Sequence, residues 1–208
     1  MTSGCAKNPL QCARAWRKTS SRCVDLFQFI ALVTAWLVMG ATCLHAQQSS
    51  PTENQVKSAY LYNFGKFVEW PAKGMTSGEF FTFCVLGDDS FSSNLETTIG
   101  GESINGKKVL VKRVAKPQDA VSCRVLFISS LEQGRLKEIL AAVDDTSVLT
   151  VSDMPQFTRR GGMIQFVIEA NRVRFEVNLT SAEHAGLTLS SQLLKVAINV
   201  KRNAQPGS

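Results

Sequence analysis

The side chains that could do chemistry are few, and each lacks the companions that its chemistry needs. Beyond residue 46 the only histidine is His184, in the run Ser181-Ala182-Glu183-His184. Acyl transfer by a serine needs a histidine base held by a carboxylate, and the sequence contains no G-x-S-x-G nucleophile elbow. We therefore interpret His184 as an ordinary residue on a helical surface and predict that the chain is not an enzyme.

The turn Gly87-Asp88-Asp89-Ser90 follows a predicted strand, at the kind of position where α/β proteins bind phosphate. It holds one glycine and not a dinucleotide-binding fingerprint, and its paired carboxylates would repel phosphate. We predict that Asp88, Asp89 or Ser90 instead caps the helix that follows.

Metal chemistry is not favoured either. Asp144, Asp145 and Asp153 match no calcium-binding spacing. Zinc needs three or four ligands, whereas the chain beyond residue 46 offers two cysteines and one histidine. We therefore predict no metal site and no cofactor.

Two features indicate contact with another protein. Arg159-Arg160 precedes two glycines and forms a basic turn that suits an acidic partner, although such turns are more often simply solvated. Tyr62 belongs to an aromatic-rich predicted helix but falls outside its main apolar face, so this helix is covered either by the core alone or also by a second protein. We take Arg159, Arg160 and Tyr62 as candidate partner-binding residues.

The net charge of +6 does not predict nucleic-acid binding. Residues 1–46 hold five of the 23 basic residues and one of the 17 acidic ones, so 18 basic and 16 acidic residues remain and the rest of the chain is only +2. That balance lacks the basic stripe that nucleic-acid binding needs.

The first 46 residues read as a secretory signal peptide. Five basic residues precede an uncharged apolar run over residues 29–44, and small residues follow over residues 41–46. An uncleaved membrane anchor is one alternative, and a lipoprotein attached at Cys43 is another. We predict a periplasmic protein with a polar linker over residues 47–53, one domain over residues 54–202 and a disordered tail over residues 203–208.

Two cysteines remain beyond the predicted signal, Cys84 and Cys123, and each lies in a run that reads as a buried strand. Exported proteins with two cysteines usually pair them, and a bridge that closes a loop of about 40 residues stabilises the fold by roughly 4 kcal/mol in the chain-entropy model. Two buried free thiols are the alternative.

Apolar periodicity predicts strands that alternate with helices, followed by a hairpin and a last helix. The predicted helices cover residues 54–70, 91–99 and 131–143, and a final one is marked by the stripe Leu189, Leu193, Val196, Ala197 and Val200. The predicted strands cover residues 80–86, 109–114, 124–129, 148–151, 163–169 and 172–178. This order favours an α/β fold with a mixed, largely parallel sheet, helices on both faces, and a C-terminal β-hairpin and helix.

Several blocks in this order resemble the YfiR-type family of exported regulatory domains. They include the opening helix 56–71, the strand and turn 83–89, the strand 123–129, the segments 149–153, 161–164 and 171–178, and the closing block 185–194. Together they span roughly residues 55–200.

The resemblance implies a periplasmic α/β domain without enzymatic activity that represses an inner-membrane diguanylate cyclase of the YfiN type by direct contact. Such repression lowers cyclic di-GMP signalling and limits biofilm formation. It also implies a homodimer and a disulfide between Cys84 and Cys123. Some members carry a second cysteine pair, and this chain has Thr158 and Gln165 in that area. A periplasmic sensor that binds a small molecule and feeds a kinase or a transporter is the alternative function.

Overall fold

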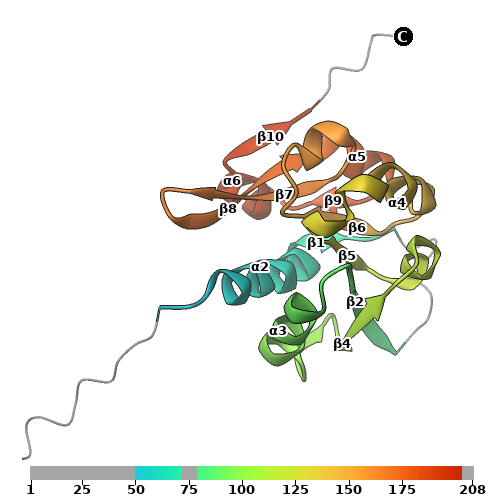
Figure 1. Ribbon diagram of the computed structural model, residues 1–208, viewed down its shortest axis with the longest axis vertical. Coiled ribbons are helices and arrows are strands. Elements are labelled where there is room, and N and C mark those ends of the chain that lie inside the picture. The colour runs from blue at the N-terminus through green and yellow to red at the C-terminus, as the bar shows by residue number, and fades with distance from the viewer. Residues whose placement is uncertain (1–49, 72–78, 203–208) are drawn as a thin grey trace, which may run out of the picture. The chain divides into compact units, whose positions relative to one another are not determined.

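The computed structural model describes residues 50–71 and 79–202, so the predictions for the signal peptide and for the C-terminal tail lie outside the described residues. The described residues from Pro51 onward belong to one compact unit, and its centre is an eight-stranded sheet in the order β10-β8-β7-β6-β5-β2-β4-β3 (Figure 1). The strands of this sheet are β2 (Phe80–Leu86), β3 (Ser103–Ile104), β4 (Lys107–Val114), β5 (Val125–Ile128), β6 (Leu149–Ser152), β7 (Ile164–Glu169), β8 (Arg172–Asn178) and β10 (Asn199–Lys201).

Five neighbouring strands, β4-β2-β5-β6-β7, run parallel, and β8 returns antiparallel to β7. The hairpin between β7 and β8 turns at Ala170 and Asn171, which both have positive φ angles of 47° and 59°, as a two-residue hairpin turn requires. The predicted mixed, largely parallel sheet with its C-terminal hairpin is therefore confirmed.

Side chains alternate between the two faces of the sheet, as the strand repeat of two residues demands. On β2, Phe83 and Val85 enter a first hydrophobic cluster, whereas Cys84 and Leu86 enter a second. The helices that supply the first cluster are α2 (Glu53–Phe67), α3 (Asp89–Ile99), α5 (Leu179–His184) and α6 (Ser191–Val196). The second is covered by η2 (Pro117–Ser122), α4 (Leu136–Ala142) and η4 (Phe157–Arg160), so both faces carry helical segments.

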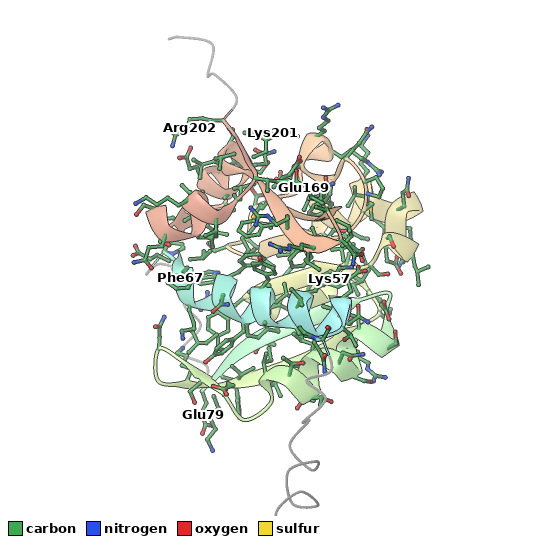
Figure 2. The ribbon with its side chains drawn as sticks, turned by 90° about the vertical axis from the view of Figure 1, so that its left-hand side faces the viewer. Lys57, Phe67, Glu79, Glu169, Lys201 and Arg202 are labelled. Carbon is green, nitrogen blue, oxygen red and sulfur yellow. A yellow bond between two sulfur atoms is a disulfide. The ribbon has the colours of Figure 1, made fainter. Side chains whose placement is uncertain are left out.

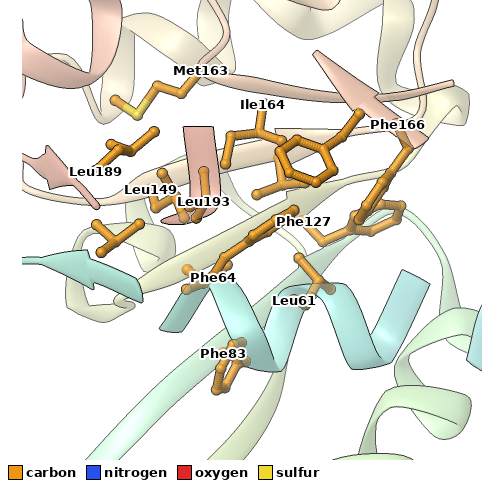
Figure 3. Packing of buried hydrophobic residues seen from close by; sticks show 14 of the residues in the cluster. Leu61, Phe64, Phe83, Phe127, Leu149, Met163, Ile164, Phe166, Leu189 and Leu193 are labelled. Atoms are coloured by element: carbon orange, nitrogen blue, oxygen red, sulfur yellow. The ribbon is translucent and has the colours of Figure 1, made fainter. Parts of the chain in front are cut away.

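Helix α2 is the main element on the first face. A capping box between Thr52 and Gln55 starts it, because each side chain accepts a hydrogen bond from the other residue's backbone N–H. Gly65 lets the helix approach the sheet, since a Cβ atom there would lie 2.8 Å from Ile104 Cδ1. Figure 3 shows Leu61 and Phe64 of this helix within the packed cluster, close to Phe127.

Three predicted helices have different bounds in the structure. The first ends at Phe67 and not at Trp70, because Val68–Glu69 forms β1, which pairs antiparallel with β9 (Thr188–Leu189). The helix predicted over residues 131–143 begins as the 3₁₀ segment η3 (Ser130–Arg135), which contains the poor helix former Gly134, and is α-helical only from Leu136.

The last helix is much shorter than its apolar stripe suggested. Leu189 lies in β9 and Val200 in β10, so only α6 between them is helical. The Ile198 amide donates to the Phe175 carbonyl at 3.0 Å, which draws the chain beside β8 and out of the helix. Of the stripe, Leu189 and Leu193 are buried in the first cluster and Ala197 packs against it, whereas Val196 and Val200 remain exposed.

Candidate functional site

An apolar groove of about 270 Å³ lies between α2 and α6. We call it the apolar groove, and its walls are Tyr60, Asn63, Phe64, Phe67, Phe175, Gln192, Leu193 and Val196. Six of these eight side chains are aromatic or aliphatic. A hollow of this composition suits a hydrophobic side chain or helix face of another molecule better than a polar substrate.

Aromatic packing beneath the groove holds its floor in place. The Phe64 ring meets the Phe175 ring edge-on at a centroid distance of 5.0 Å, and Tyr60 meets Phe175 in the same way at 5.4 Å. Phe166 lies 5.9 Å from Phe64 in a stacked arrangement. Such pairs prefer these geometries and add to the energy of burial, so the groove is a preformed feature of the fold.

The rim of the groove continues into an exposed apolar strip. Val196 is 55% exposed, and Phe67, Ile198 and Val200 are each more than a third exposed. Phe67 lies at the end of α2 opposite to Lys57 (Figure 2), and Ile198 and Val200 lie in and beside the edge strand β10. Large apolar side chains that gather in one place on a surface mark a contact site more often than scattered ones do.

The predicted partner-binding residues lie elsewhere. Arg159 and Arg160 belong to η4, which packs through Phe157 into the second cluster, whereas Tyr62 packs against the first. Arg159 is exposed, and the Arg160 guanidinium donates to the Gln133 carbonyl at 3.3 Å. The structure therefore does not bring Tyr62 together with the two arginines.

Tyr62 is engaged within its own chain. Its hydroxyl donates to Glu102 Oε2 at 3.1 Å and lies 3.3 Å from the Ser103 carbonyl oxygen. Desolvation raises the pKa of the Tyr62 phenol, and the hydrogen bond to the Glu102 carboxylate raises it further. The phenol thus remains a neutral donor that ties α2 to β3.

The carboxyl ends of β2 and β6, where α/β proteins usually bind ligands, carry an ion-pair cluster. Lys57 is only 5% exposed, and its Nζ atom lies 2.6 Å from Glu53 Oε1 and 2.8 Å from Asp153 Oδ2. Burial lowers the pKa of Lys57, but the hydrogen bonds to Asp153 and Glu53 outweigh it and raise the pKa above its usual value. A lysine that stays protonated cannot act as a nucleophile, so this cluster does not provide a catalytic amine.

Asp88 caps α3, as predicted for this turn, because its Oδ1 accepts a hydrogen bond from the Phe91 amide at 2.9 Å.

Within residues 50–71 and 79–202 no group of three or more histidine, cysteine, aspartate or glutamate side chains could hold a metal ion. His184 is exposed on α5. In the same part of the chain no helix is long and apolar enough to cross a membrane.

The predicted disulfide between Cys84 and Cys123 is present. It links the middle of β2 to the residue that ends η2, with a Cα–Cα distance of 5.9 Å. Both cysteines are almost fully buried in the second cluster, so this bridge lies inside the fold and away from the apolar groove.

The sequence predicted that the first helix is rich in aromatic residues and has a main apolar face, but it did not join this face to the C-terminal segment. In the structure Tyr60, Phe64 and Phe67 of this helix line the groove. The partners across the groove, Leu193 and Val196, belonged to the predicted apolar stripe of the last helix. The sequence pattern that indicated the groove was therefore a pair of apolar helix faces. Only the fold shows that these two faces contact each other.

Comparisons with known proteins found one family model and solved structures that this chain resembles. Residues 54–198 match a family model described as YfiR/HmsC-like, and no curated protein matches. A conserved domain protein from Vibrio cholerae O1 biovar El Tor has a similar solved structure, with a TM-score of 0.52 and 12% sequence identity, and the match covers 74% of this chain and 62% of that one. An ABC domain from Streptococcus pneumoniae solved with L-Trp matches with a TM-score of 0.43 and 14% identity over 62% of this chain and 57% of that one.

Proposed function

Because the chain belongs to the YfiR/HmsC-like family, we propose that it represses an inner-membrane diguanylate cyclase of the YfiN type by direct contact and so lowers cyclic di-GMP signalling. The family consists of periplasmic regulatory domains and is not a known enzyme family. The observation that carries the proposal is this match, which extends over residues 54–198 and so includes nearly all of the described fold.

The apolar groove is the surface that we assign to the cyclase. It is preformed, it is lined mainly by aromatic and aliphatic side chains, and its rim keeps Phe67 and Val196 exposed. Burial of such side chains against a partner removes apolar surface from water, which favours association, and a few buried aromatic anchors usually dominate the affinity. Arg159, Arg160 and Tyr62 remain predicted contacts outside the groove, and the homodimer also remains a prediction.

Deletion of the gene tests repression directly. We expect cellular cyclic di-GMP, measured by mass spectrometry, to rise in the deletion strain and to return to the wild-type level when the gene is supplied on a plasmid. An unchanged level after deletion would contradict repression.

A variant pair tests the surface. Val196→Asp places a charge on the rim of the apolar groove, so we expect it to fail to restore low cyclic di-GMP. Leu131→Asp is the matched control, because Leu131 is 79% exposed on η3 and lies outside the groove. Both variants must accumulate to the wild-type level, and equal restoration by the two would exclude the groove as the contact surface.

A further inference from the structure

A second hollow, of about 440 Å³, lies at the amino ends of β2, β4 and β5 and shares no lining residue with the apolar groove. We call it the basic pocket. Part of its wall is apolar and mainly aromatic, because the Trp70 and Phe81 rings meet edge-on at a centroid distance of 5.3 Å and Ile104 also lines the pocket. This wall suits a planar apolar group.

The charged side chains of the basic pocket are mostly cations. Lys66, Lys107 and Arg124 line it, against one carboxylate from Glu69, so the lining carries a net charge of +2. Within the described part of the chain no carboxylate lies within 4.0 Å of any of these three cations. Lys66 instead lies 5.3 Å from the centre of the Tyr62 ring.

Two groups in the basic pocket are partly removed from water. Arg124 is half-buried, and this burial lowers the pKa of its guanidinium. The Trp70 indole N–H is buried and has no hydrogen-bond acceptor among the described residues. A buried donor without an acceptor costs free energy, so the indole N–H favours a molecule that carries an acceptor, and the excess of cations favours a negatively charged one.

We propose that the basic pocket binds a small organic anion, namely a carboxylate or a phosphate joined to a planar apolar group. Arg124 and Lys107 hold the anionic group, and the Trp70–Phe81 wall contacts the planar part. This site does not depend on repression of a cyclase, because it is defined by the pocket and can be measured on the isolated protein.

The test follows the Trp70 indole N–H by NMR in the full-length, ¹⁵N-labelled chain. The chain has three tryptophans, and the Trp70 signal is assigned by its loss in Trp70→Phe. We expect benzoate or phenyl phosphate to shift this signal saturably, and the stronger of the two identifies a carboxylate or a phosphate ligand. Benzyl alcohol, which has the same ring and no charge, is expected to bind at least tenfold more weakly.

Substitutions in the basic pocket test which side chains hold the anionic group of the ligand. Because one charged hydrogen bond is worth a tenfold change in affinity or more, we expect Arg124→Gln and Lys107→Gln each to raise the dissociation constant about tenfold. Lys108→Gln is the matched control, since Lys108 is exposed next to Lys107 on β4 and does not line the pocket. Equal binding of benzyl alcohol and the anions, an unmoved indole signal, or wild-type affinity in both Arg124→Gln and Lys107→Gln would each overturn the proposal.

Discussion

Asp88 shows how much a single side chain contributes to this fold. Its carboxylate accepts hydrogen bonds from the Phe91 amide at 2.9 Å and from the Ser90 hydroxyl at 2.8 Å. Partial burial acts to raise the pKa of Asp88, but these hydrogen bonds lower it below its ordinary value. The negative charge also lies at the N-terminus of α3, where the helix dipole favours an anion.

This pKa shift predicts a pH-dependent stability. Because the folded-state pKa of Asp88 is depressed, its contribution is complete above the unfolded pKa and is lost as the pH falls from about 4 through the lower folded value. Asp88→Asn keeps an oxygen that can cap the helix but removes the charge. Urea denaturation should show wild type more stable than the variant by about 0.5–1 kcal/mol near pH 7, with a much smaller difference at pH 3. A difference that stays constant between these pH values would contradict this role of the charge.

At the scale of elements, the disulfide joins two parts of the sheet that are 39 residues apart in sequence. Cys84 lies on β2, between β4 and β5, and Cys123 lies two residues before the start of β5. The bridge spans β4, α3 and η2 in sequence, so it limits how far these elements can separate in the unfolded chain. Thr158 and Gln165 form no second bridge, and the Thr158 amide instead donates to Gln165 Oε1 at 3.4 Å.

Replacement of either cysteine should therefore destabilise the fold to the same extent, because each removes the same disulfide. We expect Cys84→Ser and Cys123→Ser each to lower the unfolding free energy by up to about 4 kcal/mol, which lowers the melting temperature by roughly 10 °C for a domain of this size. The double variant should lose no more than either single one, since one bond is removed in each case. Calorimetry that showed additive losses would mean that the two residues act independently.

At the scale of the whole molecule, the predicted export decides where the fold works. The family is periplasmic, and an oxidising compartment allows the Cys84–Cys123 bridge to persist. The predicted signal peptide over residues 1–46 carries a net charge of +4, which is most of the net charge of +6 of the chain. The protein that meets its partner is therefore expected to be nearly neutral and to bind mainly through apolar contact.

Cell fractionation tests this expectation. We predict that the protein is released with the periplasmic fraction and that mass spectrometry finds Gln47 at its N-terminus, because cleavage after Ala46 removes the apolar run. Thiol labelling without reductant should leave Cys84 and Cys123 unmodified. A full-length chain in the cytosol with both thiols labelled would contradict export.

Local patterns in the sequence predicted most of the strands and helices and the fold class. A continuous apolar run predicted β2 closely, and two β-rich runs predicted the hairpin of β7 and β8, because these signals depend on neighbouring residues only. The disulfide could be predicted because the chain beyond the predicted signal has two cysteines and is expected to be exported to an oxidising compartment. Only the tertiary structure decided where α2 and the last helix end, since pairing of β1 with β9 and of β10 with β8 overrides helical periodicity.

The two candidate sites likewise depended on tertiary structure. The apolar groove joins Phe67 to Val196, and the basic pocket joins Trp70 to Arg124, across separations that no local pattern encodes. An apolar stripe predicts which residues are buried but not which other stripe they pack against, because the order and direction of the strands set the packing partners. For this reason the sequence indicated a protein that acts by binding another protein, and the fold decided which of its surfaces are available for binding.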